Sequence, residues 1–355
     1  MTLIKQLLAA TALVSASATV ANATDLEVMH WWTSGGEAAA VAEFANAFTA
    51  SGHTWIDGAI AGGDNARPVM VSRITGGNPP GAFQFNHGRQ AEELIESGLL
   101  RDITDIAEAE GWKDIVNPSN LLGACTVDGR IFCAPVNIHS WQWLWVGHQA
   151  YKDAGIDVPT NWNEFAASAP ALEAAGKVPL AMGQQGWQQG GAFNVLMSSL
   201  VPQDVFMSVY GDKDVGVAAG GEIATVFQAA SDARAMTLNA PVQNWNDATN
   251  MLITGKAGGQ IMGDWAQGEF AVAEQVAGED YSCLPGLGVT EVLGTGGDAF
   301  YFPVLKDAEQ AAAQAELAAL LLKPETQVAF NLKKGSLPVR GDIDLSSAND
   351  CMQKG

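Results

Sequence analysis

Apolar residues recur along the chain with two periods, a short one typical of strands and a longer one typical of helices. Residues 26–30 and 81–85 are compact apolar runs, which predicts strands. Between them, Val41, Phe44 and Phe48 are spaced by three and then four residues, which predicts a helix with one apolar face. This alternation of strands and helices is typical of an α/β fold. Two further helices are predicted near the end of the chain, at residues 307–322 and 324–334.

Tryptophans gather where predicted strands end. Trp31 and Trp32 follow the first strand, and Trp265 follows the apolar run at residues 260–262. Ligands of open α/β sheets bind beyond the carboxyl ends of the strands, so these indoles are candidate ligand contacts. Adjacent strand residues point to opposite faces, so one of Trp31 and Trp32 could instead belong to the core. The alternating tryptophans of a further apolar run are predicted to be core residues: Trp141, Trp143 and Trp145.

The first 23 residues have the pattern of a secretory signal peptide. Lys5 provides a short positive region, residues 7–20 are apolar, and residues 21–23 have the Ala-x-Ala form of a cleavage site. The apolar stretch is shorter than the ~20 residues that a membrane-spanning helix needs. Because this signal contains no cysteine that could carry a lipid, we expect a mature protein that starts near Thr24, free in the periplasm and not lipid-anchored.

Four cysteines suit such an oxidising compartment. Cys125 and Cys133 flank an Asp-Gly pair, which favours the tight turn of a β-hairpin. The hairpin would bring these two together and leave Cys283 to pair with Cys351. A metal site is the alternative, but the sequence has neither a CxxC motif nor a nearby pair of histidines. We therefore predict two disulfides and no metal.

Charge and composition restrict the partners. The chain has 39 acidic and 18 basic residues, a net charge of -21, which would repel nucleic acid and anionic membranes alike. A length of 355 residues predicts two domains or one large domain. The chain also has 11 tryptophans against 4 tyrosines. Tryptophan combines a flat apolar ring with an N–H donor, so this excess indicates aromatic packing or aromatic recognition.

The sequence has no motif of nucleotide-binding, metalloprotease or serine-hydrolase chemistry. It contains no GxGxxG that opens a helix, no GxxxxGK[ST], no GxSxG and no HExxH. We therefore predict no cofactor and no catalytic residues. The many carboxylates leave one enzyme hypothesis open, a secreted glycoside hydrolase that uses two of them.

Five segments, taken together and in order, resemble one family. Residues 29–37 read MHWWTSGGE and residues 260–265 read QIMGDW; both are similar to segments of the sugar-binding proteins of bacterial ABC transporters, especially those for glucose and related monosaccharides. Three more segments agree: residues 74–80 (ITGGNPP), 135–139 (PVNIH) and 334–340 (KGSLPVR). Each is weak alone, but together they span nearly the whole mature chain.

The resemblance implies a two-lobed α/β fold like that of maltose-binding protein, with lobes that close on a sugar by a hinge motion. It places the hinge near residues 137–139 and 281–283. Family members usually continue beyond the position of Gly355 with helices of the second lobe, so we expect that lobe to be incomplete here. The implied division is a signal peptide at 1–23, an N-terminal lobe at 24–137 plus 283–303, and a C-terminal lobe at 138–282 plus 304–355.

The resemblance also implies a set of sugar contacts. Glu37 has a structural alternative, since a carboxylate at a helix start favours the helix dipole. Asn86 is neutral where some family members carry a charge, and Trp245, in a polar loop, would stack on the sugar from the second lobe. The implied substrate-binding residues are Trp31, Trp32, Glu37, Gln84, Asn86, His139, Trp245, Trp265, Asp298 and Lys334.

Sugar chemistry supports this interpretation. A pyranose presents apolar C–H faces, which suit indoles, and a rim of hydroxyls, which need donors and acceptors. Buried hydroxyls must all be hydrogen-bonded, so such a site discriminates between sugars. We therefore expect a monomeric, non-enzymatic periplasmic protein that delivers a monosaccharide, glucose or a close relative, to the membrane permease subunits of an ABC importer.

Overall fold

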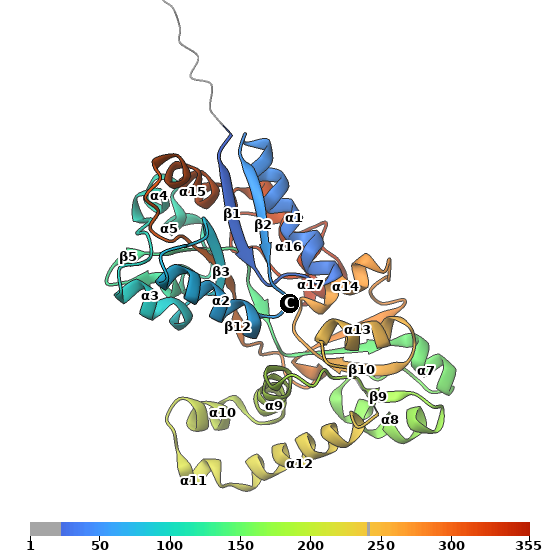
Figure 1. Cartoon of the computed structure of the whole chain (residues 1–355). Helices are drawn as coiled ribbons and strands as arrows, with labels where there is room; N and C mark the ends of the chain where they lie inside the picture. Colours follow the sequence, from blue (N-terminus) through green and yellow to red (C-terminus); the bar gives the residue numbers. More distant parts are fainter. Residues whose placement is uncertain (1–22, 240–241) are drawn as a thin grey trace, which may run out of the picture.

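The computed structural model describes residues 23–239 and 242–355. The predicted signal peptide therefore lies outside the described residues, apart from Ala23 at its end. The described part contains no helix that is both long and apolar enough to cross a membrane. The chain forms two lobes, drawn one above the other in Figure 1.

The first lobe is built on a five-stranded sheet. β1 is parallel to β2 and β3, whereas β13 is antiparallel to β3 and β6. In sheet order the strands are β2 (Thr54–Ala59), β1 (Asp25–His30), β3 (Ala82–Asn86), β13 (Asp298–Tyr301) and β6 (Cys133–Pro135). Its helices are α1 (Gly35–Ala50), α2 (Gly63–Thr75), η1 (Arg89–Ala91), α3 (Glu92–Glu96), α4 (Thr104–Ala109), α5 (Trp112–Ile115), α6 (Asn120–Ala124), α15 (Ala308–Leu321) and α16 (Pro324–Lys334).

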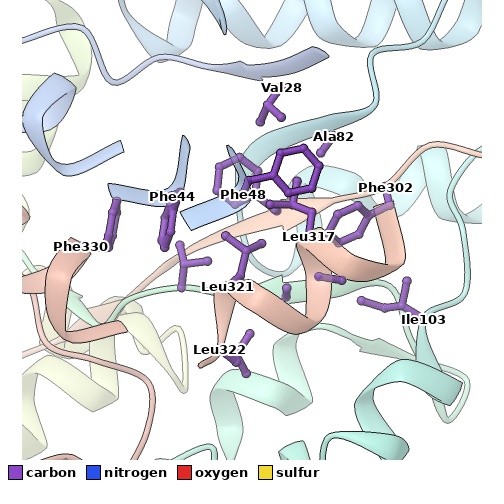
Figure 2. Close-up of a cluster of buried hydrophobic side chains, with 14 of the residues drawn as sticks. Val28, Phe44, Phe48, Ala82, Ile103, Phe302, Leu317, Leu321, Leu322 and Phe330 are labelled. Atoms are coloured by element: carbon purple, nitrogen blue, oxygen red, sulfur yellow. The ribbon is translucent and has the colours of Figure 1, made fainter. Parts of the chain in front are cut away.

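The core of this lobe is formed by helices from the beginning and from the end of the chain. Phe44 of α1 stacks on Phe330 of α16, with ring centroids 4.1 Å apart, and Leu317 and Leu321 of α15 pack in the same cluster (Figure 2). The predicted assignment of residues 304–355 to the second lobe is therefore wrong for α15 and α16. Their apolar faces are buried against α1 and the first sheet. Helical periodicity predicts that a helix has an apolar face, but it does not predict which lobe that face packs against.

The second lobe is built on a four-stranded sheet. Trp143 and Trp145 of β8 stack with centroids 5.7 Å apart and are buried, as predicted for core residues. In sheet order the strands are β11 (Tyr281–Pro285), β8 (Trp143–Gly147), β10 (Ala257–Ile261) and β9 (Val178–Leu180). The helices are α7 (His148–Ala154), α8 (Trp162–Ala174), α9 (Gly186–Leu200), α10 (Gln203–Tyr210), α11 (Val215–Ala218), α12 (Gly221–Met236), α13 (Trp245–Ile253), α14 (Ala266–Val272), η2 (Gly286–Gly288) and α17 (Asp350–Lys354).

The chain crosses between the lobes three times, and the crossings are hydrogen-bonded to one another. β7 (His139–Ser140) lies on the first crossing and pairs with β12 (Thr295–Gly296) on the second. Ile138 and Leu337 form an isolated bridge between the first and third crossings. The predicted hinge at residues 281–283 is wrong, because these residues lie inside β11, where they pair with β8.

Both predicted disulfides are present. Cys125 and Cys133 are joined across the hairpin of β4 (Thr126–Val127) and β5 (Arg130–Ile131). Asp128 and Gly129 both have positive φ, 50° and 75°, as the predicted tight turn requires. Cys283 and Cys351 are joined over a sequence separation of 68 residues and fasten α17 to β11. The four cysteines are all accounted for, and none is free.

Candidate functional site

A buried ion pair lies where the first lobe faces the second. The Nζ of Lys334, at the end of α16, is 3.4 Å from the Oε1 of Glu37 in the first turn of α1. α16 ends here because Gly335 adopts the left-handed conformation, with φ 85°. The Nζ of Lys334 also lies 5.7 Å from the ring centroids of both Trp32 and Trp265. The ammonium is therefore shared by a carboxylate and by one indole from each lobe.

Glu37 is both a helix-cap partner and a site residue. Its backbone N–H donates to the N-cap hydroxyl of Ser34, and that hydroxyl donates to Glu37 Oε2 at 3.2 Å, which forms a reciprocal cap. Burial raises the pKa of Glu37, and the nearby charge of Lys334 opposes that rise. The structure therefore shows the capping contact of Glu37, and the same side chain also pairs with Lys334.

Asp298, at the start of β13, lies at the centre of a hydrogen-bond network. Its Oδ1 accepts from the amides of Gln84 and Asn86, at 3.0 and 3.4 Å. Its Oδ2 accepts from the amide of Asn137 at 3.0 Å and lies 3.5 Å from Nδ1 of His139. Burial alone would raise the pKa of Asp298, but the hydrogen bond and charge of His139, with the charge of Lys334, lower it below its usual value.

Asp264 fastens the hinge to the second lobe. Its Oδ2 accepts from the backbone N–H of Ser140 at 2.7 Å, and its own N–H donates to the Ser140 carbonyl. Its Oδ1 is buried and has no hydrogen-bond partner among the described residues. Burial raises the pKa of Asp264 to about 7, against the opposing effect of His139. A cavity of about 20 Å³ lies beside it, lined in part by Ser140, Trp143 and Gly335.

The second lobe contributes an aromatic cluster. The ring of Trp265 meets those of His139 and Trp141 edge to face, with centroids 5.4 and 4.8 Å apart, and Trp141 meets Trp187 in the same way. Trp141 therefore lies in this cluster and not within β8, unlike Trp143. In each edge-to-face contact the edge of one ring packs against the face of the next, which fixes the orientation of the rings in this cluster.

The other predicted tryptophans have different surroundings. Trp32 is 1% exposed and packs against Phe300 and Phe330, so it is the core member of the Trp31–Trp32 pair. Trp31 is only partly buried, and its backbone N–H donates to Gln84 Oε1 at 3.0 Å. Trp245 is the first residue of α13 and is buried in the cluster that contains Trp265, whereas the sequence predicted a loop.

The lobes touch beside the ion pair through two glycines. A Cβ placed on Gly268 of α14 would lie 3.1 Å from the Cα of Gly36 and 2.9 Å from the Lys333 carbonyl oxygen. The backbone N–H of Gly36 donates to Glu269 Oε1 at 2.8 Å, so a second-lobe carboxylate caps α1. Gly268, Glu269 and Asn137 were not among the predicted site residues. Only Asn137 had a signal, because it precedes His139 in the PVNIH segment.

One larger cavity lies elsewhere in the second lobe. It measures about 420 Å³, and its lining includes Met182, Phe193, Leu196 and Arg234 from α9, α12 and the segment before α9. None of the predicted site residues lines it. The charged and aromatic groups described above therefore form a separate site between the lobes.

Similar proteins are found by sequence and by structure. A probable sugar-binding periplasmic protein of Brucella melitensis is 37% identical over 353 residues, which cover 98% of this chain and 83% of the relative. The bacterial solute receptor AcbH has a TM-score of 0.74 at 19% identity and covers 93% of this chain and 84% of its own. Maltose-bound MalE3 of T. maritima has a TM-score of 0.70 at 16% identity, over 93% and 86% of the two chains.

These comparisons confirm the predicted fold class, the two-lobed α/β fold of periplasmic binding proteins. At such low identities the two structures show the fold and nothing more. The sequence profile described as bacterial extracellular solute-binding protein matches residues 32–328, which is most of the chain. The protein belongs to the bacterial extracellular solute-binding protein family.

Proposed function

We propose that this protein captures a monosaccharide, glucose or a close relative, in the periplasm and delivers it to the permease subunits of an ABC importer. It acts as a monomer without a cofactor. The sugar binds between the lobes, with its apolar faces against indoles and its hydroxyls toward the buried charged groups. The name of the Brucella melitensis relative, a probable sugar-binding periplasmic protein, supports the ligand class.

A single observation carries the proposal. Lys334 lies near an indole of each lobe, Trp32 and Trp265, and pairs with Glu37. The indole of Trp265, beside a charged donor and a charged acceptor, matches the two surfaces of a pyranose. Trp32 is a core residue and contacts the ammonium from the first lobe. Because the groups come from both lobes, lobe closure would complete the site around the sugar and exclude water from it.

The tight approach of the lobes favours a small ligand. Gly36 and Gly268 meet backbone to backbone beside the ion pair, which leaves little room there for a second sugar ring. We therefore expect a monosaccharide to bind more tightly than the matching disaccharide. Membership of a solute-binding family places the chain among transport receptors and sets aside the glycoside hydrolase hypothesis.

Calorimetry with purified protein tests the ligand class. D-glucose, D-galactose, D-mannose, D-xylose and maltose are titrated in turn, with L-glucose as the mirror-image control. We expect a Kd of ~1 µM or tighter for one monosaccharide, about -8 kcal/mol, because capture from a dilute medium requires it. A folded protein that gives no heat with any of these sugars would contradict the proposal, and tighter binding of maltose would contradict the monosaccharide part.

The transport role needs a separate measurement. The permease and ATPase subunits of an ABC sugar importer from the same organism are reconstituted in proteoliposomes, and ATP hydrolysis is followed with and without the sugar-loaded protein. We expect stimulation only when both the protein and its sugar are present. Equal stimulation by the sugar alone would remove the delivery role and leave the binding role intact.

A further inference from the structure

The carboxylate of Asp298 has no acceptor capacity left. Four nitrogens lie within 3.5 Å of its two oxygens, two at Oδ1 and two at Oδ2. A carboxylate offers about four acceptor positions. Hydrogen bonds from three amides take three of them, and the imidazole of His139 lies against the fourth as an ion-pair partner. Asp298 is also 3% exposed, which leaves no face of the carboxylate open to solvent. A sugar hydroxyl could bind it only by displacing one of these donors.

Two of the four donors are themselves held at both ends of the amide. Gln84 is 0% exposed; its Nε2 donates to Asp298 and its Oε1 accepts from the backbone N–H of Trp31. Asn137 is also 0% exposed; its Nδ2 donates to Asp298 and its Oδ1 accepts from the backbone N–H of Asp298 at 2.7 Å. Both amides are therefore locked in one orientation between the carboxylate and the backbone.

We propose that Asp298 and Gln84 are positioning residues, which hold Trp31 and His139 in place for the sugar and do not bind its hydroxyls themselves. One arm runs from Asp298 through Gln84 to the backbone of Trp31, the partly exposed indole at the end of β1. The other runs from Asp298 directly to His139 on β7. The inference rests on the proposed sugar-binding function. It means that a carboxylate other than Asp298 accepts hydrogen bonds from the sugar hydroxyls.

The acceptor role then falls to Glu37. Each of its oxygens has a single contact, Oε1 with Lys334 at 3.4 Å and Oε2 with the Ser34 hydroxyl at 3.2 Å, so about two of its acceptor positions remain for a ligand. Glu37 also lies at the end of α1 that meets the second lobe. Asp298 and Glu37 thus differ in kind, since the first is saturated by the protein and the second is not.

Sugars that lack one hydroxyl separate the two roles. Kd is measured for D-glucose, D-galactose and D-xylose, and then for analogues of the tightest binder that each lack one hydroxyl. Asp298→Asn places an amide donor among buried donors, and we expect it to raise Kd by the same factor for the parent sugar and every analogue, about 10- to 100-fold. Glu37→Gln is expected to raise Kd for the parent sugar and for every analogue except one. For the analogue that lacks the hydroxyl bound by Glu37, the wild type and the variant should have the same Kd.

The matched control is Asp214→Asn in the second lobe. Asp214 is an exposed N-cap of α11 that accepts from the N–H of Val217, and asparagine caps a helix as well as aspartate does. We expect its Kd to be unchanged. An Asp298→Asn effect that vanishes for one analogue would overturn the inference, because it would show a direct bond from Asp298 to that hydroxyl.

A second measurement needs no sugar. Hydrogen exchange at the Trp31 amide, followed by NMR, is expected to be about tenfold faster in Asp298→Asn than in the wild type, because Gln84 loses its anchor and releases the amide. Gln84→Met should accelerate the same amide at least as much, and Asp214→Asn should not. An unchanged Trp31 amide in the folded Asp298→Asn protein would overturn the inference. If the wild type binds no sugar, the proposed function fails, while this measurement still decides the positioning role.

Discussion

The two sides of the interlobe site are built from different chemistry. The first lobe contributes buried charges held by directional hydrogen bonds, with Asp298 and Glu37 as their centres. The second contributes rings held by packing, with Trp265 and Trp141 edge to face. Hydrogen bonds fix positions within a few tenths of an ångström, whereas ring contacts tolerate small shifts. We therefore expect the first lobe to set which sugar binds and the second to set how tightly sugars bind in general.

The largest expected effect is on the charged side. Lys334→Met leaves Glu37 buried near Asp298 without its cation, and removing one partner of a buried pair costs about 3–5 kcal/mol. Urea denaturation measures this free energy of unfolding. The adjacent Lys333 pairs with Glu43 while half exposed, so Lys333→Met should cost no more than about 1 kcal/mol. If both substitutions lower the free energy of unfolding equally, the buried pair contributes no more to stability than the exposed pair does.

On the aromatic side, Trp265→Ala should weaken sugar binding by ~1–3 kcal/mol through lost ring contact and lost ordering of its neighbours. The loss should be similar for every sugar that binds, because ring contact is not specific to one hydroxyl. Calorimetry with two or more sugars measures it. Trp55→Ala on β2, where the indole packs against Phe48, is the control and should leave Kd unchanged. A loss confined to one sugar would contradict the division of roles between the lobes.

The contact between the two sides should have an intermediate effect. Gly268→Ala puts a methyl group against the backbone of Gly36. Backbone atoms cannot rotate away from this contact as a flexible side chain could. We expect weaker binding by about 1–2 kcal/mol, the usual cost of overpacking, and a larger radius of gyration of the sugar-bound form by X-ray scattering. Gly123→Ala in α6 meets nothing within 4 Å and serves as control. Unchanged scattering and affinity would show that this approach does not limit closure.

The smallest effect concerns pH at the hinge. The folded-state pKa of Asp264 is raised to about 7, so the native state binds a proton that the unfolded state releases between about pH 4 and pH 7. This contribution to stability is present at low pH and is lost as pH rises toward 7. Between pH 6 and pH 8 the free energy of unfolding should fall by about 1 kcal/mol more in the wild type than in Asp264→Asn. If the free energies of unfolding of the two proteins change with pH in parallel, Asp264 does not contribute to this pH dependence.

Local features of the fold were predictable from sequence. The Asp128–Gly129 turn fixed the pairing of Cys125 with Cys133, and Pro324 and Gly335 bounded a helix, because these signals act within a few residues. Membership of a lobe was not predictable for α15 and α16. Their apolar faces fit either sheet by periodicity, and only the stacking of Phe330 on Phe44 decides between them.

The sequence predicted a set of candidate residues but not the network of contacts that joins them. The structure brings Glu37, Lys334, Trp32 and Trp265 together from four separate segments. The sequence could not show that Asp298 is saturated, because that depends on amides contributed by β3 and by the first crossing. Nor could the sequence distinguish buried Trp32 from partly exposed Trp31. Neighbouring residues point to opposite sides, and the sequence does not show which side is covered by other elements.

The disulfide between Cys283 and Cys351 makes part of this receptor a covalent ring. The chain leaves the second lobe after β11, passes through β13, α15 and α16 of the first lobe, and returns to be closed by the bond. A ring of this size stabilises the fold by about 4 kcal/mol in the chain-entropy description. After one protease nick anywhere between the two cysteines, the C-terminal fragment would remain covalently attached to the rest of the chain, and only reduction of the disulfide would allow its release.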